Sequence, residues 1–342
     1  MVDVTLLLPV YNGERYLRET LQSLLSQTYT DFELLIVDDG STDSSADIIR
    51  RFADPRIRLL KNPERLKLSG ALNRGMKEAK GRYIARMDAD DIALPRRLQQ
   101  QFAYMEAHPE VGMCGTAIEI FGKDHPRRDV YPATSDAIRA YGLFDCPFCH
   151  PSVMMRKGMF FQYDLWYDGE YYPTEDYELW ARAIELFPTV NLDEVLLRYR
   201  IHESSMTGSD WDAMDKQAAR VALPLLHNLG VLPSKTELRL HRNIGRGRSC
   251  QLRDMEEVEQ AEQWLKRLIT ANQQRECYNP VALARTIALI WFRVCMNSSS
   301  LGFVLLSKYA TSSLRKRDEK SISNLLTLLA SVVKQQLVRK TT

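Results

Sequence analysis

The chain has 342 residues, 45% of them hydrophobic and 26% charged, which excludes disordered, collagen-like and disulfide-scaffold proteins and suits about two globular domains. Its net charge of +2 hides an asymmetry, because residues 1–210 hold 25 Lys and Arg against 33 Asp and Glu, whereas residues 211–342 hold 21 against 11. We therefore expect two segments with different roles, the basic one suited to an anionic membrane surface, nucleic acid or an acidic partner.

The first hundred residues alternate short apolar runs with segments of helical spacing, and this pattern predicts an α/β fold with a mainly parallel sheet and crossover helices. Strands are expected at 4–10, 32–39, 57–62 and 82–91. Helices are expected at about 14–26, after the turn at 40–43, and at 69–80. Strands around 112–121, 151–155 and 196–202 and an amphipathic helix at 175–187 extend the same segment.

Strand patterns end at about residue 210, where the charge also changes sign. The rest of the chain predicts only helices, at about 211–229, 233–242, 253–272, 280–296 and 318–338, with Gly, Pro and Ser between them. We therefore expect two domains, an α/β domain over 1–207 and a basic helical domain over 208–342.

Targeting signals are not recognisable in the sequence. The opening residues have no basic region, apolar core or cleavage site of a signal peptide, so we expect a cytoplasmic protein with reduced thiols. The most apolar stretch, Val281 to Leu306, is interrupted by Arg285 and Arg293, and we do not expect it to cross a bilayer. Peripheral attachment to the inner face of the cytoplasmic membrane stays open.

Asp88, Ala89, Asp90 and Asp91 directly follow a predicted strand. The carboxyl ends of parallel strands are where α/β sheets bind ligands. Two carboxylates one residue apart can hold a divalent cation, which in turn binds a diphosphate. The alternative is a solvated acidic turn that caps the following helix.

A second acidic pair, Asp38 and Asp39, ends the second predicted strand, and such carboxylates can accept hydrogen bonds from a ribose or a base. The alternative is a cap and turn with Gly40. Because Pro9 to Glu14 ends the first strand, all three strand ends are expected to converge on one crevice.

These motifs together resemble the family 2 glycosyltransferases, inverting enzymes with a GT-A fold, over roughly residues 3–205. The segments that carry the resemblance are PVYNGERYLRETLQSLLSQTYTDFELLIVDDGSTDSS and ALNRGMKEAKGRYIARMDADD. The resemblance implies a Rossmann-like domain that binds a nucleoside-diphosphate sugar, with UDP as the expected nucleotide and Mn²⁺ or Mg²⁺ as the metal. The residues that it places around the nucleotide sugar are Pro9, Tyr11, Glu14, Asp38, Asp39, Lys67, Asp88, Ala89 and Asp90.

Within that set, the resemblance gives Asp39 the base, Asp88 the ribose or sugar, and Asp90 the metal. Lys67 lies in a loop, Arg65 to Lys67, where relatives often have a glycine, so this part of the pattern departs from the family.

The resemblance places a catalytic base in the pair Glu175 and Asp176 at the start of a predicted helix. Inversion needs a carboxylate that removes the acceptor's proton, and we assign this role to Asp176 with Glu175 in support. The alternative is structural, because acidic residues in the first turn favour a helix by interacting with its dipole. His202, at the end of the last strand, is expected near the donor diphosphate and metal, and the alternative is a surface or capping residue. His150 is expected either on the acceptor side or in a structural turn before the strand at 151–155.

The basic C-terminal helices carry apolar faces, which suit either an anionic lipid surface or an ordinary helical subdomain. The function that we expect is transfer to a saccharide or lipid-linked acceptor in cell-surface polysaccharide or glycolipid synthesis. No nucleic-acid partner is expected, and the sequence leaves the oligomeric state open.

Two alternatives are weighed against this function. A metal-dependent nucleotidyltransferase normally has a Gly-rich basic loop after its first strand, whereas Leu7 to Glu14 offers one Gly and no Lys. A non-catalytic nucleotide-sugar-binding protein is disfavoured by the intact acidic pairs.

Overall fold

A computed structural model describes residues 2–122, 125–203, 211–246, 250, 252–315 and 319–341. The chain forms two compact units. The first, here the sheet unit, comprises Met1–Ile138 and Cys146–Gln217, and the second, the helical unit, comprises Arg139–Asp145 and Ala218–Thr342. The expected boundary between residues 207 and 208 falls at 204–210, outside the described residues.

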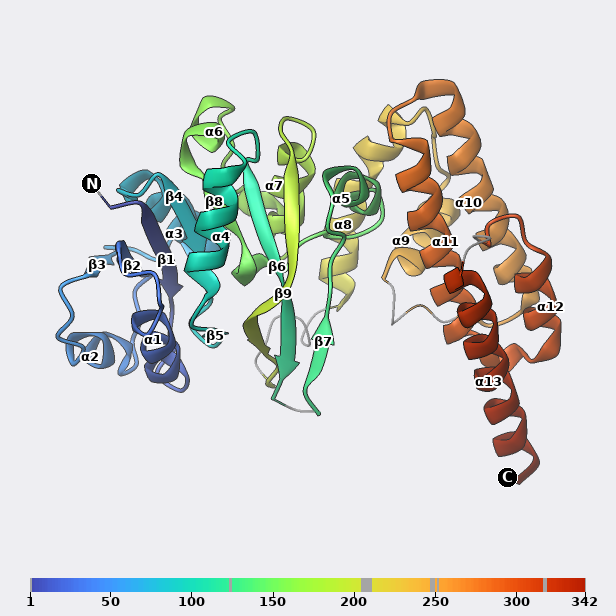
Figure 1. Ribbon diagram of the computed structural model, residues 1–342, viewed down its shortest axis with the longest axis horizontal. Helices are drawn as coiled ribbons and strands as arrows, with labels where there is room; N and C mark the ends of the chain where they lie inside the picture. The colour runs from blue at the N-terminus through green and yellow to red at the C-terminus, as the bar shows by residue number, and fades with distance from the viewer. Residues whose placement is uncertain are drawn as a thin grey trace. The chain divides into compact units, whose positions relative to one another are not determined.

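The sheet unit contains nine described strands in one mixed sheet (Figure 1). Along the sheet these are β3 (Ile57–Lys61), β2 (Phe32–Asp38), β1 (Val4–Val10), β4 (Tyr83–Arg86), β8 (Met154–Arg156), β6 (Met113–Phe121), β9 (Thr189–Arg200) and β5 (Ile92–Ala93). The short strand β7 (Arg127–Asp129) pairs with β6. The first four strands are mutually parallel, whereas β8 runs antiparallel to both β4 and β6. The α/β fold expected from the sequence is confirmed.

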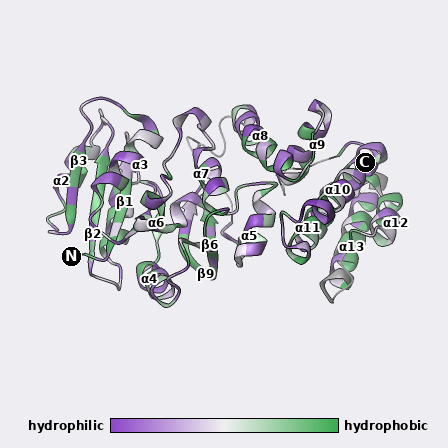
Figure 2. Cartoon of the chain, turned by 90° about the horizontal axis from the view of Figure 1, so that it is seen from above, coloured by the Kyte–Doolittle hydropathy of each residue, from purple (hydrophilic) through white to green (hydrophobic). Residues whose placement is uncertain are grey.

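Both faces of the sheet are covered by helices, which explains why β1 and β2 are buried at every position. Alternate residues of β1 enter two separate cores, with Leu6 and Leu8 in one and Leu7 in the other. The first core includes α1 (Leu17–Leu25), α2 (Ser45–Arg50) and α4 (Arg97–Ala107). The second includes α3 (Lys67–Glu78), α6 (Lys157–Gln162) and α7 (Glu175–Ala183). Hydrophobic colouring follows the inner strands in Figure 2.

Helix α3 approaches β1 so closely that its Gly75 has no room for a side chain. A Cβ at Gly75 would lie 2.1 Å from Leu7 Cδ1. The glycine therefore sets the spacing of helix and sheet directly behind the strand ends that carry the candidate site.

Two strands differ from the sequence expectation. The strand predicted over 82–91 ends at Arg86, so the acidic residues lie in a loop and not in the strand. Strand β9 begins at Thr189, earlier than the predicted 196. Its pairing with β6 shifts register where Leu192 faces Thr116 and Val195 faces Ala117, so Asp193 and Glu194 occupy a bulge. Two consecutive acidic residues in this bulge break the alternating pattern that predicts a strand.

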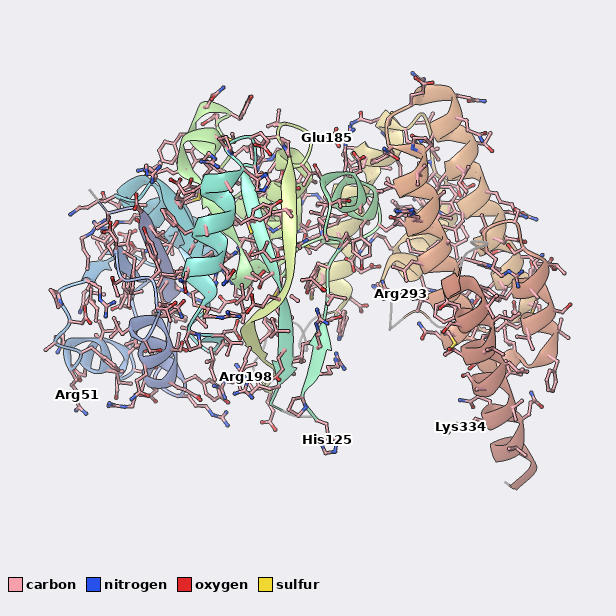
Figure 3. The ribbon with its side chains drawn as sticks, in the orientation of Figure 1. Arg51, His125, Glu185, Arg198, Arg293 and Lys334 are labelled. Atoms are coloured by element: carbon pink, nitrogen blue, oxygen red, sulfur yellow. The ribbon has the colours of Figure 1, made fainter. Side chains whose placement is uncertain are left out.

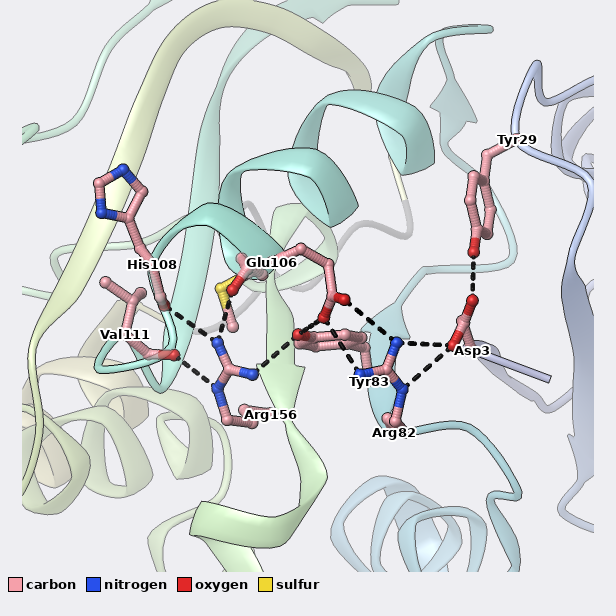
Figure 4. A network of polar contacts seen from close by, with 9 residues as sticks. Asp3, Tyr29, Arg82, Tyr83, Glu106, His108, Val111 and Arg156 are labelled. Atoms are coloured by element: carbon pink, nitrogen blue, oxygen red, sulfur yellow. Dashed lines mark hydrogen bonds and ion pairs between the residues drawn. The ribbon is translucent and has the colours of Figure 1, made fainter. Parts of the chain in front are cut away.

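A polar network lies at the N-terminal ends of β1 and β4 (Figure 4). Arg82 pairs with Asp3 at 2.7 Å and with Glu106, and Glu106 also accepts a hydrogen bond from Tyr83. Arg156 donates to the Tyr83 hydroxyl at 2.8 Å. The same guanidinium donates to three backbone carbonyls around the C-terminus of α4, those of Met105, His108 and Val111. This network caps α4 and ties it to the sheet.

The helical unit consists of helices and their connections. It holds most of α8 (Trp211–Asn228) together with α9 (Lys235–Gly245), α10 (Met255–Arg275), α11 (Pro280–Asn297), α12 (Phe303–Thr311) and α13 (Glu319–Thr341). The segment Arg139–Asp145 also belongs to this unit, although it lies far from the other helices in sequence. It includes the C-terminal half of the remaining helix, α5 (Ser135–Gly142).

His241 anchors that segment. Its Nε2 donates to the Leu143 carbonyl at 2.9 Å, while its Nδ1 accepts from Trp264 Nε1 at 3.1 Å. Burial lowers the pKa of His241 to about 3, so the imidazole is neutral, as this donor and acceptor pattern requires.

Among the described helices, α11 is long and apolar enough to span a membrane by length and composition. It packs against α10 and α13, and buried core helices have the same length and composition. The expectation that the chain does not cross a bilayer stays a prediction.

Candidate active site

The C-terminal ends of β1 and β2 lie side by side, because Val10 pairs with Asp38 in the parallel register. Asp38 and Asp39 are both buried there. Asp38 Oδ1 accepts a hydrogen bond from the Ser41 amide at 2.9 Å. Asp39 Oδ1 accepts from Asn62 Nδ2 at 2.5 Å and from the Leu66 amide at 2.7 Å. Both carboxylates thus lie at the expected sheet edge, where they also fix the loops that follow β2 and β3.

The loop after β1 is tied to the loop after β2. The Gly13 amide donates to Ser45 Oγ at 2.8 Å, and the Glu14 amide donates to an Asp43 carboxylate oxygen at 3.0 Å. In return, the Glu14 carboxylate accepts from the Ser44 amide at 2.9 Å. Glu14, a predicted donor-site residue, therefore joins the loops after β1 and β2 in the described structure.

Three further predicted donor residues lie around the same edge. Pro9 is within β1, opposite Val37. Tyr11 is 41% exposed, and the Arg65 guanidinium lies 3.7 Å from its ring centroid. Lys67 is exposed at the start of α3 with a left-handed backbone (φ 59°). The ring of Tyr11 and the guanidinium of Arg65 are both planar groups on which a nucleobase can stack.

The loop after β4 gathers three carboxylates. Asp88, Asp90 and Asp91 each offer an oxygen, and these atoms lie within 4.8 Å of one another. Thr20 Oγ1 donates to the carbonyls of Ala89 and Asp91, at 3.0 and 2.9 Å, which fixes the path of the loop. Asp91 is buried, and its Oδ1 accepts from the Arg200 amide at 2.8 Å, but its Oδ2 is buried without a hydrogen-bond partner.

The electrostatics of this cluster favour a cation. Burial raises the pKa of Asp88, and burial together with Asp88 and Asp90 raises the pKa of Asp91 well above its usual range. Carboxylate oxygens are the ligands that hard divalent cations prefer. A cluster of three such groups that contains a buried, unpartnered oxygen fits Mn²⁺ or Mg²⁺. Asp91 was not among the predicted site residues, although it directly follows the recognised motif.

His202 reaches the cluster from the end of β9. Its Nε2 lies 2.9 Å from Asp90 Oδ2, and its ring packs on Tyr16 with the centroids 4.9 Å apart. Arg200 Nε donates to the Asp90 carbonyl at 2.7 Å, which joins the two chain segments. The structure therefore brings together Asp90 and His202, the two residues predicted to hold a metal.

Glu175 and Asp176 begin α7. Glu175 is buried with its Oε2 unpartnered, and Asp176 Oδ1 accepts from the Tyr177 amide at 2.7 Å. Burial raises the pKa of Glu175 to about 7 and that of Asp176 to about 6. A carboxylate with such a pKa can take up a proton near neutral pH, which is what a general base requires.

His150 lies between Asp176 and Tyr167. Its Nδ1 is 3.9 Å from Asp176 Oδ2, and its Nε2 is 2.9 Å from the Tyr167 hydroxyl. Burial lowers the pKa of His150 well below its usual value, so the ring is neutral. Tyr167 was missed because it belongs to none of the recognised motifs. His150 thus lies beside the predicted base, in a short 3-10 helix (His150–Ser152) before β8, and its role on the acceptor side stays a prediction.

Arg86 is the last residue of β4. Its buried guanidinium lies near the carboxylates that follow β4 and near Glu175 and Asp176. Its Nη1 donates to Asp88 at 2.5 Å, and its Nε has no partner. Its positive charge also offsets part of the rise in pKa that burial causes for Glu175 and Asp176. The sequence interpretation missed Arg86 because a single Arg in a predicted strand gives no sign of whether it faces solvent or a site.

Several known proteins resemble this chain in sequence. A family model described as glycosyl transferase family 2 matches residues 5–163. The amylovoran biosynthesis glycosyltransferase AmsE of Erwinia amylovora is 34% identical over 205 residues, which are 57% of this chain and 75% of that protein. The UDP-Glc:alpha-D-GlcNAc-diphosphoundecaprenol beta-1,3-glucosyltransferase WfgD of Escherichia coli is 27% identical over 216 residues, 63% of this chain and 83% of that protein.

The fold also resembles a solved structure. The crystal structure of S. aureus TarS 1-349 in complex with UDP-GlcNAc matches with a TM-score of 0.57 at 18% identity, covering 97% of this chain and 92% of that one.

Proposed function

The chain belongs to glycosyl transferase family 2, and on that premise we propose that it transfers a sugar with inversion from a nucleoside-diphosphate sugar to a saccharide or lipid-linked acceptor. The observation that carries this proposal is the pairing of two acidic groups around one buried guanidinium. Asp88, Asp90 and Asp91 form the first group, and Glu175 with Asp176 the second, while the charge of Arg86 acts on both.

The first group is assigned to the donor. When bound, Mn²⁺ or Mg²⁺ supplies positive charge that stabilises a leaving diphosphate. Asp90, Asp91 and His202 are the residues that would hold it, and Asp88 is assigned to the ribose or sugar. Pro9, Tyr11, Glu14, Asp38 and Asp39 are assigned to the nucleoside and Lys67 to the donor.

The second group is assigned to the acceptor. Asp176 removes the proton from the acceptor hydroxyl, whose oxygen forms a bond to the anomeric carbon as the bond from that carbon to the diphosphate oxygen breaks. The diphosphate leaves with the electron pair of the broken bond, and Asp176 keeps the proton. Glu175 and neutral His150 position the base. The attack comes from the face opposite the leaving group, so the configuration inverts.

UDP is the proposed nucleotide and a lipid-linked saccharide the proposed acceptor. Both are named in the description of the E. coli relative, a UDP-glucose enzyme that acts on a diphosphoundecaprenol-linked sugar. The amylovoran relative supports a place in polysaccharide synthesis. We place the enzyme in the cytoplasm, at the inner face of the membrane where such acceptors are held.

The experiment that tests the proposed function replaces the base. Asp176→Asn should bind the donor as the wild type does in a calorimetric titration with Mn²⁺, but it should release nucleoside diphosphate at least about 100-fold more slowly in the presence of a lipid extract. The matched control is Glu185→Gln, an exposed acidic residue just beyond α7 (Figure 3), which should retain activity. An active Asn variant would mean that the base lies elsewhere. A wild type that binds donor but never turns it over would favour the non-catalytic alternative.

A further inference from the structure

Helix α13 leaves a row of large apolar side chains exposed. Leu328 and Val332, on one side of the helix, are fully buried. A second row is exposed, at 67, 61, 37, 39 and 61% for Ile322, Leu326, Leu329, Val333 and Leu337. Because these residues recur every three or four positions, they share one side of the helix. We call this row the α13 stripe.

The start of α12 adds to this surface. Phe303 is 58% and Val304 is 64% exposed. A Cβ on Gly302 would lie 2.7 Å from the Gln336 side chain, so the start of α12 touches the C-terminal half of α13. Helices α12 and α13 are therefore neighbours, and the exposed Phe303 and Val304 add apolar surface close to α13. Figure 2 shows hydrophobic residues in both helices. Soluble proteins seldom leave a contiguous apolar row such as the α13 stripe uncovered without a binding role.

The net charge of this part of the sequence indicates what covers the α13 stripe. Residues 299–342 contain eight Lys and Arg against two Asp and Glu, an excess of six positive charges. Helix α12 contains no acidic residue, and the first residue of α13, Glu319, is the single acidic residue of that helix. Beside the stripe, the exposed residues Ser323 and Thr327 are uncharged and Lys334 is basic (Figure 3).

An apolar helix face beside basic and uncharged residues suits the interface of an anionic bilayer, where apolar side chains enter the acyl boundary and Lys and Arg meet the headgroups. Pairing with a second copy would instead bring together two segments that each carry the same positive excess. We propose that the α13 stripe, with Phe303 and Val304, binds an anionic lipid bilayer. This assignment concerns where the protein is held and does not depend on the reaction proposed above.

The test uses the full chain and vesicles of phosphatidylcholine with or without about one third phosphatidylglycerol. The variant Ile322→Gln/Leu326→Gln removes two exposed stripe residues and keeps a good helix former at both positions. Its matched control, Ser323→Gln/Thr327→Gln, changes two exposed residues outside the stripe on the same helix. Flotation gives the bound fraction, circular dichroism the helix content and light scattering the oligomeric state.

We expect the wild type to bind the anionic vesicles, less so in high salt, and the stripe variant to bind roughly tenfold or more weakly. The control should bind as the wild type does, and both variants should keep the wild-type helix content and affinity for the nucleotide. Wild-type protein that does not bind anionic vesicles, or a stripe variant that binds them equally, would overturn the proposal. So would a wild-type dimer that the stripe variant converts to monomers, because the stripe would then be an interface between copies.

Discussion

Arg86 and Asp91 are two buried charged residues of the candidate site. Arg86 is a buried cation beside Asp88, and Asp91 presents a buried oxygen with no partner. Neither was assigned a role from the sequence, because the chemistry of each depends on its burial, and that of Asp91 also on the Arg200 amide far away in the chain. Asp88, Asp90, Glu175 and Asp176 could be selected from the sequence, since their spacing at strand and helix ends is itself the signal.

A stability measurement tests the electrostatics of Glu175. Because burial raises its pKa to about 7 from an ordinary value of 4.5, the folded protein holds a proton there that the unfolded chain releases. The resulting stabilisation is fully present below pH 4.5 and is lost as the pH rises through 7. Between pH 5 and 8 the wild type should lose about 2 kcal/mol of unfolding free energy relative to Glu175→Gln, by urea denaturation. A difference between the two proteins that stays constant over this range would contradict the assigned burial.

At the scale of elements, predictions hold where the local pattern agrees with the tertiary environment. Strands β1, β2 and β3 match their expected ranges within one residue, because their apolar runs are buried on both faces or paired in a parallel ladder. Helix α12 was not predicted, since it is short and its exposed side mixes the apolar residues Phe303 and Val304 with polar ones. The early part of β9 was hidden by its bulge.

The C-terminus of α4 provides a test of the network in Figure 4. Arg156→Ala leaves the carbonyls of Met105, His108 and Val111 without their donor, and we expect a loss of about 2 to 4 kcal/mol of unfolding free energy. Arg51→Ala, at an exposed residue after α2 (Figure 3), should change stability by less than about 0.5 kcal/mol. Nucleotide affinity should be unchanged in both folded variants. Equal stability of the two variants would show that the capping contacts contribute little.

At the scale of the whole molecule, the acidic and basic segments differ in the roles assigned to them. Every residue assigned to the reaction lies in the acidic segment, within the sheet unit. The sequence interpretation separated the units by a single cut, but Arg139–Asp145 belongs to the helical unit. The place of this segment in the helical unit could not be predicted from the sequence pattern, since it depends on His241 and Arg242, which bind the carbonyls of Leu143 and Phe144.

Truncation tests whether the segment Arg139–Asp145 needs the helical unit to remain buried. A fragment of residues 1–217 lacks the helices that bury Leu143 and Phe144, both fully buried in the intact chain. We expect this fragment to bind the dye ANS and to unfold several degrees below the intact protein. The fragment with Leu143→Ser and Phe144→Ser should bind less of the dye. A plain 1–217 fragment with the melting temperature of the intact chain would show that the segment does not need the helical unit.

The central claim is that the carboxylates after β4 bind a nucleotide through a divalent cation, and calorimetry tests it most directly. Titrating UDP into the wild type with Mn²⁺ should give clear binding that EDTA weakens at least about tenfold, because the diphosphate then loses its counter-charge. Asp90→Ala should bind UDP equally weakly with and without Mn²⁺, whereas Asp47→Ala, at an exposed residue of α2, should behave as the wild type. The same UDP affinity with Mn²⁺, with EDTA and in the Asp90→Ala variant would contradict the claim.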